Sequence, residues 1–76
     1  MTADIAKKIF TELLELQEPV DWDTVKYQEV ESWDSLAHMA IVAELEDTLG
    51  IMLDTDDIID MSSFAKSVEI LERYVS

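Results

Sequence analysis

The chain has a single glycine and a single proline among its 76 residues, and no other feature limits the possible folds as strongly. These two residue types supply most of the tight turns in folds built from many short strands, so a sandwich or a barrel is disfavoured. Apolar side chains recur at helical spacing instead, as they do at Ile5, Ile9 and Leu13. We therefore expect an all-α fold, a four-helix bundle with a long first loop and a short third helix.

The first predicted helix is closed by Pro19, because the residue before a proline avoids helical backbone angles. From residue 18 to residue 34 there is no helical period, and we expect an ordered loop. A small hairpin is the alternative, but an isolated two-stranded hairpin is marginally stable at best. Loops of this length are uncommon in compact domains and are often functional.

The second predicted helix runs from Ser35 to about Leu49, with Gly50 as its C-terminal stop. Ser35 can act as the N-cap, since a serine oxygen accepts hydrogen bonds from the free N–H groups of the first turn. A short third helix is expected to begin at Thr55. The fourth helix is expected to have a serine N-cap, and the candidates are Ser62 and Ser63.

Two apolar stripes lie on nearly opposite sides of the second predicted helix. One is expected to face the core, and it consists of His38, Ile41, Val42, Leu45 and Leu49. The other consists of Leu36, Met39, Ala40 and Ala43, with Glu44, Glu46 and Asp47 beside it. A helix in so small a bundle can hardly be buried on both sides, so we expect the second stripe to be an exposed docking surface. The alternative is that Leu36 and Met39 pack under the long loop.

Eighteen acidic and five basic residues give the chain a formal net charge of −13, which disfavours nucleic acid as a partner because its phosphates would be repelled. The segment from residue 27 to residue 65 contains no lysine or arginine. Its carboxylates are Glu29, Glu31, Asp34, Glu44, Glu46, Asp47, Asp54, Asp56, Asp57 and Asp60. We therefore expect the middle of the chain to meet a basic partner protein.

The composition also excludes several kinds of site. Without cysteine there can be no disulfide, no thiolate metal site and no cysteine nucleophile, and a single histidine excludes a multi-histidine metal site. No apolar run approaches the roughly 18 residues that span a membrane. Because the N-terminus also lacks a signal pattern, we expect a cytoplasmic protein that has no membrane contact.

Two further patterns could carry chemistry, and for both we favour a simpler interpretation. Ser35 and His38 are three residues apart, but nucleophilic catalysis also needs an orienting group, an oxyanion hole and a cleft that excludes water. We expect a half-buried histidine and no catalytic site. The acidic run from Asp54 to Asp60 lacks the glycine and the final glutamate of a calcium loop, so no specific metal site is expected.

The triplet Asp34-Ser35-Leu36 opens the second predicted helix directly after the long loop. The segment LEDTLGI at 45–51, the short acidic helix and the serine-containing start of the fourth helix follow it. In this arrangement, over essentially its whole length, the chain resembles the acyl and peptidyl carrier protein family. We therefore expect residues 1–76 to form a single, free-standing carrier domain that acts as a monomer.

The resemblance implies a modified serine and a set of partner enzymes. In this family a phosphopantetheinyl transferase uses coenzyme A and magnesium to attach 4′-phosphopantetheine to the motif serine, here Ser35 between Asp34 and Leu36. The thiol of that arm carries acyl groups as thioesters to acyl- or aminoacyl-loading and acyl-transfer or condensing enzymes, while the carrier itself catalyses nothing. The predicted docking residues are Leu36, Met39, Ala40, Ala43, Glu44, Asp47 and Ile58.

The residues around the motif depart from those of fatty-acid carriers, which commonly have a glycine shortly before the motif and an acidic residue after its leucine. Trp33 precedes the motif here, and the segment Ala37-His38-Met39 follows it. These departures favour a discrete carrier of a specialised pathway, such as polyketide, aminoacyl or envelope-polysaccharide synthesis, with fatty acid synthesis as the next alternative. From a different class, the alternative is an acidic helical adaptor that binds a basic partner protein and is never modified.

Overall fold

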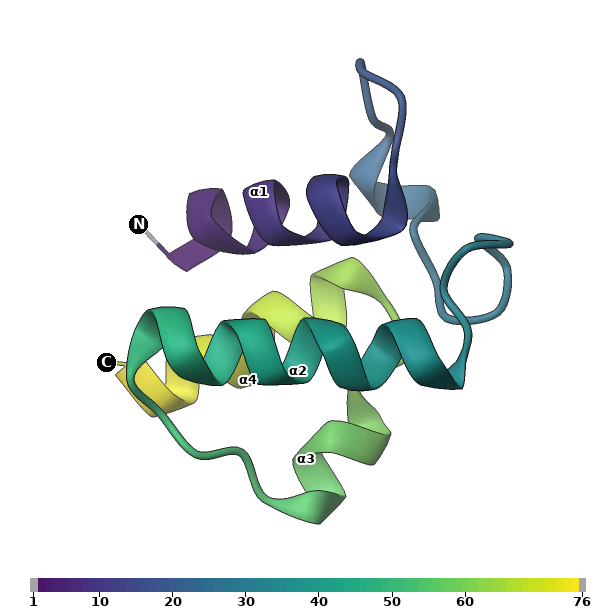
Figure 1. Cartoon of the computed structure of the whole chain (residues 1–76). Helices are drawn as coiled ribbons and strands as arrows, with labels where there is room; N and C mark the ends of the chain where they lie inside the picture. The colour runs from purple at the N-terminus through teal and green to yellow at the C-terminus, as the bar shows by residue number, and fades with distance from the viewer. Residues whose placement is uncertain (1, 76) are drawn as a thin grey trace.

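The computed structural model describes residues 2–75, and within them it contains four α-helices and one short 3₁₀ helix (Figure 1). The elements are α1 (Thr2–Leu14), η1 (Trp22–Thr24), α2 (Ser35–Leu49), α3 (Thr55–Asp60) and α4 (Phe64–Val75). Figure 1 shows α1 and α2 running in opposite directions, and α4 contacts both α1 and the short α3. No strand forms in the described residues, so the predicted all-α bundle with a long first loop and a short third helix is confirmed. No helix within 2–75 is long and apolar enough to cross a membrane.

The core is built around three aromatic rings. The ring of Phe10 lies between those of Trp33 and Phe64, with centroids 5.1 and 5.2 Å away and both contacts edge to face. Trp33 is completely buried, although it belongs to the long loop. Further core side chains come from the helices and from the segments on either side of α3, and they include Ile9, Leu14, Ile41, Val42, Leu45, Leu53, Met61, Ile70 and Leu71. The loop before α2 is therefore part of the core, and its burial fixes where α2 begins.

Helix α1 ends at Leu14, so the prediction that Pro19 closes it was wrong. Glu15 adopts left-handed backbone angles (φ 53°), a conformation that ends many helices. The hydroxyl of Ser32, from the far end of the long loop, donates a hydrogen bond to the carbonyl of Leu14 at 2.8 Å. A contact between residues distant in the sequence therefore satisfies the end of this helix, and no local pattern indicates it.

The long loop is ordered, as expected, but it contains no hairpin. After η1 it pairs instead with the residues that precede α4. The amide of Tyr27 donates to the carbonyl of Ser62 at 2.9 Å. In the same way, the amide of Phe64 donates to the carbonyl of Val25 at 2.8 Å. These two hydrogen bonds attach the long loop to the start of α4. The loop segment is therefore stabilised by a neighbouring segment and does not need to pair with itself.

Helix α2 begins at Ser35, as predicted, but its N-cap is Asp34, so the prediction that Ser35 caps the helix was wrong. Asp34 has extended backbone angles, and its carboxylate accepts a hydrogen bond from the amide of Ala37 at 2.9 Å. Ser35 is the first residue inside the helix, one position too late for the capping geometry. Gly50 ends the helix in the left-handed conformation (φ 66°), as predicted.

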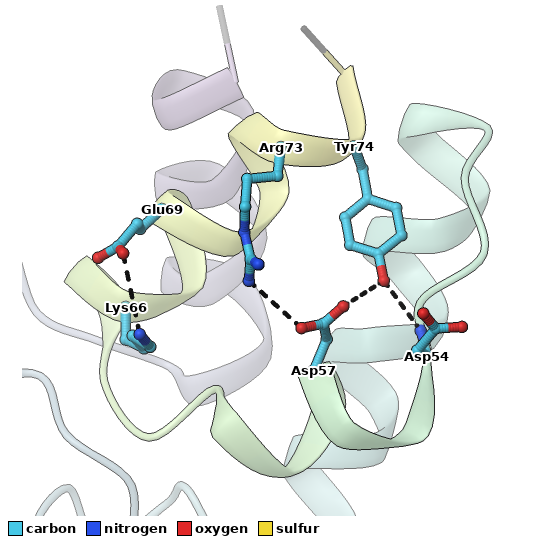
Figure 2. Close-up of polar contacts among 6 residues, drawn as sticks. All are labelled: Asp54, Asp57, Lys66, Glu69, Arg73 and Tyr74. Carbon is cyan, nitrogen blue, oxygen red and sulfur yellow. Dashed lines mark hydrogen bonds and ion pairs between the residues drawn. The ribbon is translucent and has the colours of Figure 1, made fainter.

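The last two helices are joined by polar contacts, which Figure 2 shows. The hydroxyl of Tyr74 in α4 donates to the carboxylate of Asp57 in α3, and it accepts from the amide of Asp54 at 3.1 Å. Arg73 lies 3.3 Å from the same Asp57 carboxylate. The short third helix is thus held against α4 by the carboxylate of Asp57.

Of the two serines predicted as candidate N-caps of α4, Ser63 is the one that caps it, since its hydroxyl oxygen accepts a hydrogen bond from the amide of Lys66 in the first turn at 3.0 Å.

Candidate functional site

Ser35 lies exposed at the first position of α2, directly after the long loop. Its Oγ is 3.0 Å from the hydroxyl oxygen of Tyr27, a half-buried residue of that loop. Its neighbour Asp34 is engaged in capping the helix, and its other neighbour Leu36 is 82% exposed. The Ser35 hydroxyl is therefore accessible from solvent and has a defined hydrogen-bond partner.

His38 lies one turn further along α2, and both of its ring nitrogens have partners other than Ser35. The indole Nε1 of Trp33 donates to Nδ1 at 3.0 Å, and Nε2 lies 2.8 Å from the carbonyl oxygen of Ile58 in α3. An indole N–H can only donate and a carbonyl oxygen can only accept, so these contacts require a neutral ring with its proton on Nε2. The histidine is half-buried, as expected, and its hydrogen bonds join α2 to the loop and to α3.

A pocket of about 300 Å³ opens beside Ser35. Its lining residues are Tyr27, Ser35, His38, Met39, Ile58, Ile59 and Met61, so it lies between the start of α2 and the segment of α3. Small-molecule sites of roughly 300–1,000 Å³ typically combine apolar walls with a few polar groups. Here the polar groups are the Tyr27 and Ser35 hydroxyls and the His38 ring. A larger hollow of about 540 Å³, between α1 and the long loop, contains none of the predicted site residues.

The second apolar stripe of α2 is exposed and does not pack under the long loop. Met39 is 53% exposed, and the other members of the stripe are also exposed: Leu36, Ala40 and Ala43. On α3 the strongly exposed large hydrophobic side chain is Ile59, at 72%, whereas the predicted docking residue Ile58 is half-buried and packs against the core. Spacing within a six-residue helix could not decide which of two adjacent isoleucines points outwards.

The acidic residues beside this stripe are not equivalent. Glu44 and Asp47 are exposed, but Glu46 turns away and accepts a hydrogen bond from the amide of Leu53 at 2.8 Å. Exposed acidic and apolar side chains thus share one side of the helix. We call this surface the α2 face, and it consists of Leu36, Met39, Ala40, Ala43, Glu44 and Asp47.

One acidic side chain of α3, that of Asp57, serves the packing of this helix. Among residues 2–75, no three histidine, aspartate or glutamate side chains come together in a group that could hold a metal ion. Asp57 instead receives the hydrogen bond of Tyr74, and this bond is the main reason why the pKa of Tyr74 is raised above its ordinary value of 10.0. The charge of Asp57 therefore stabilises the contact between α3 and α4.

Tyr27 contacts Ser35 and Ile59 lines the same pocket, although neither residue is predicted from the sequence to belong to the site. Tyr27 precedes Ser35 by eight residues and reaches it because the intervening loop turns back on itself, burying Trp33. The only signal in the sequence is that three aromatic residues, Trp22, Tyr27 and Trp33, occur in the segment 18–34, which has no helical period. That signal indicates attachment of the loop to the core, but it does not indicate which hydroxyl the tyrosine meets.

The arrangement around Ser35 offers an exposed hydroxyl, an apolar pocket and an adjoining surface of apolar and acidic side chains. It can therefore present a group attached to Ser35 to a second protein. No protein-family model matches the chain, and no curated protein sequence is significantly similar to it.

Proposed function

We propose that this chain is an acyl carrier protein in which a phosphopantetheinyl transferase attaches 4′-phosphopantetheine to Ser35. The observation that carries the proposal is the position of this serine, whose exposed hydroxyl lies at the start of α2 beside an apolar pocket and next to the α2 face. The attached group supplies a terminal thiol that holds an acyl chain as a thioester. We further propose that the carrier serves a specialised pathway, with general fatty acid synthesis as the alternative.

The surroundings of Ser35 are compatible with a phosphodiester on its oxygen. The start of a helix favours negative charge by about 0.3–1 kcal/mol, because unpaired N–H groups and the positive end of the helix dipole lie there. Asp34 reduces this contribution, since its carboxylate already occupies the amide of Ala37. The exposure of Ser35 leaves space for an arm on the solvent side, and the pocket offers apolar walls within reach of it.

The chain's own part in the proposed modification is to present Ser35. The only histidine of the sequence has both ring nitrogens occupied by Trp33 and Ile58. We propose that the base that removes the Ser35 proton comes from the transferase. The protein's task is then to hold the serine in an accessible position and to release the loaded arm to the next enzyme.

The α2 face supports docking of these enzymes. Leu36 and Met39 offer apolar contact, and Asp47 offers a negative charge that attracts a basic surface and accelerates encounter. We propose that the transferase, the acyl- or aminoacyl-loading enzymes and the acyl-transfer or condensing enzymes all bind here. The protein would do so as a monomer in the cytoplasm.

An acidic adaptor that is never modified is the alternative, and the α2 face supports it equally well. In that case Ser35 would be an ordinary surface residue. The two functions differ in one property, because only a carrier is a substrate of a phosphopantetheinyl transferase.

Incubation with coenzyme A, Mg²⁺ and a promiscuous phosphopantetheinyl transferase, followed by intact mass measurement, distinguishes the two. We expect the mass of one phosphopantetheinyl group on the wild-type protein and on Ser62→Ala, which lacks another exposed serine. Ser35→Ala should gain no mass. Modification of Ser35→Ala, or a wild-type protein that stays unmodified while a known carrier is converted in the same tube, would contradict the proposal.

A further inference from the structure

We propose that His38 is a positioning residue for Ser35, acting as a neutral clamp between the long loop and α3. The inference has two parts. The first, that His38 is a neutral clamp, depends only on the structure. The second, that the clamp aids modification of Ser35, rests on the proposed carrier function.

The clamp consists of two hydrogen bonds of opposite direction. Nδ1 of His38 accepts from the indole of Trp33 at 3.0 Å, and Nε2 donates to the carbonyl of Ile58 at 2.8 Å. Trp33 is completely buried in the loop before Ser35, and Ile58 lies in α3. One imidazole therefore connects three segments that meet at the pocket, and it also satisfies the indole N–H of a buried side chain.

The clamp reaches Ser35 through Tyr27. The ring centroid of Tyr27 lies 5.3 Å from that of His38 and 5.9 Å from that of Trp33, and its hydroxyl oxygen is 3.0 Å from Ser35 Oγ. The rings of Trp33 and His38 lie nearly parallel, with an interplanar angle of 24° and their centroids 5.9 Å apart, as the hydrogen bond between their edges requires. The position of Tyr27 therefore depends on His38 keeping its hydrogen bonds to Trp33 and Ile58. The position of the Ser35 hydroxyl depends in turn on Tyr27.

Protonation of His38 is incompatible with this arrangement. An imidazolium has an N–H on both nitrogens, so Nδ1 would face the indole N–H of Trp33 donor to donor, and one bond has to break. Besides Tyr27, the titratable groups on these segments are Lys26, Glu29, Glu31 and Asp34 in the loop between η1 and α2, Glu44, Glu46 and Asp47 in α2, and Asp56, Asp57 and Asp60 in α3, and the two hydrogen bonds of the ring go to none of them. Asp34 is engaged with an amide of α2 and Asp57 with side chains of α4, so neither forms a hydrogen bond with the ring.

Nitrogen NMR tests the first part directly, because the chain has one histidine and its signals need no separate assignment. At neutral pH we expect a protonated Nε2 and an unprotonated Nδ1. The indole signal of Trp33 should shift strongly in His38→Leu and much less in His38→Gln, since glutamine retains one acceptor and one donor. A proton on Nδ1, a charged ring at neutral pH, or equal shifts in the two variants would overturn the clamp.

Rates of modification test the second part. His38→Leu should be modified roughly three- to tenfold more slowly than the wild type, the effect of losing about one hydrogen bond. His38→Gln should be close to the wild type at neutral pH. As the pH falls through the range where NMR detects protonation of His38, the rate of the wild type should fall relative to that of His38→Gln, which cannot be protonated.

The comparison with His38→Gln removes the pH dependence of the transferase itself. Equal rates for His38→Leu and the wild type, or a constant ratio between the wild type and His38→Gln on acidification, would overturn the positioning role. If no variant is modified at any pH, the carrier function and the positioning role both fail, while the NMR result still decides whether His38 is a clamp.

Discussion

At the start of α2, Asp34 caps the helix and Ser35 presents an exposed hydroxyl, whereas the sequence pattern assigned both roles to Ser35. Asp34 satisfies the amide of Ala37, and Ser35 leaves its hydroxyl for Tyr27. Both aspartate and serine are common N-caps, so composition could not decide between them. The structure decides because Asp34 has extended backbone angles while Ser35 already lies in the helix. A group attached to Ser35 would therefore leave the cap intact.

Because Asp34 caps the helix and Ser35 does not, we expect their alanine variants to differ in stability. Asp34→Ala removes the cap and should lower the free energy of unfolding by about 1 kcal/mol. Ser35→Ala loses only one exposed hydrogen bond to Tyr27 and should lower it by clearly less. Urea denaturation of the two variants measures both values. A greater loss in Ser35→Ala than in Asp34→Ala would show that the serine is the cap after all.

Tyr74 predicts a dependence of stability on alkaline pH. Its pKa is raised in the folded protein, chiefly by the hydrogen bond to Asp57, so the folded state holds the phenol proton more tightly than the unfolded state. The stabilisation is complete below the unfolded pKa of 10.0 and is lost as the pH rises through the folded value. The wild type should therefore exceed Tyr74→Phe in unfolding free energy at neutral pH, and this margin should shrink above pH 10.

The comparison of Tyr74→Phe with the wild type at each pH cancels the titration of lysines and of the other tyrosine. Chemical denaturation from neutral to strongly alkaline pH measures the margin, which is the difference in unfolding free energy between the wild type and Tyr74→Phe. A margin that stays constant or grows above pH 10 would contradict the assigned hydrogen bond.

At the scale of elements, local signals predicted α2 well and the end of α1 poorly. Gly50 stops α2 because a glycine adopts left-handed angles at no steric cost, and this signal is visible in the sequence. Glu15 adopts the same angles without being a glycine, and the nearby contact of Ser32 with Leu14 comes from the end of the long loop. The folding of the long loop likewise determines that Tyr27 meets Ser35, and the sequence pattern that singled out Ser35 does not indicate this contact.

The exposed α2 face predicts a charge effect on partner enzymes. Asp47→Lys should slow modification or transfer by a partner enzyme with little change in melting temperature. Glu72→Lys changes the charge by the same amount at an exposed position of α4 and should have a smaller effect. The effect of Asp47→Lys should decrease at high salt, because charges separated by more than about 8 Å are screened at physiological ionic strength. Equal kinetics for the two variants would show that the α2 face is not the interface.

At the scale of the whole molecule, the fold must tolerate a net charge of −13. In the segment from α2 to α3, two acidic side chains have internal partners: Glu46 in α2 accepts a hydrogen bond from the amide of Leu53, and Asp57 in α3 binds Tyr74 and Arg73. The other carboxylates of this region are exposed, and they are Glu44, Asp47, Asp54, Asp56 and Asp60. Folding brings these like charges closer together than they are in an extended chain, which opposes the compact state.

This repulsion predicts a response to cations. Millimolar Mg²⁺ or Ca²⁺ should raise the melting temperature more than sodium chloride of equal ionic strength, through loose ligation by neighbouring carboxylates. Melting curves at matched ionic strength measure the difference. Equal shifts would mean that screening alone acts, and an unchanged melting temperature would mean that the carboxylates do not interact.

Fragment mass spectrometry of the modified protein tests most directly our proposal that Ser35 carries a phosphopantetheine arm. After incubation with coenzyme A, Mg²⁺ and a transferase, we expect one added phosphopantetheinyl group, with the added mass confined to fragments that contain Ser35. An added group on any other residue, or none under conditions that convert a known carrier completely, would contradict it.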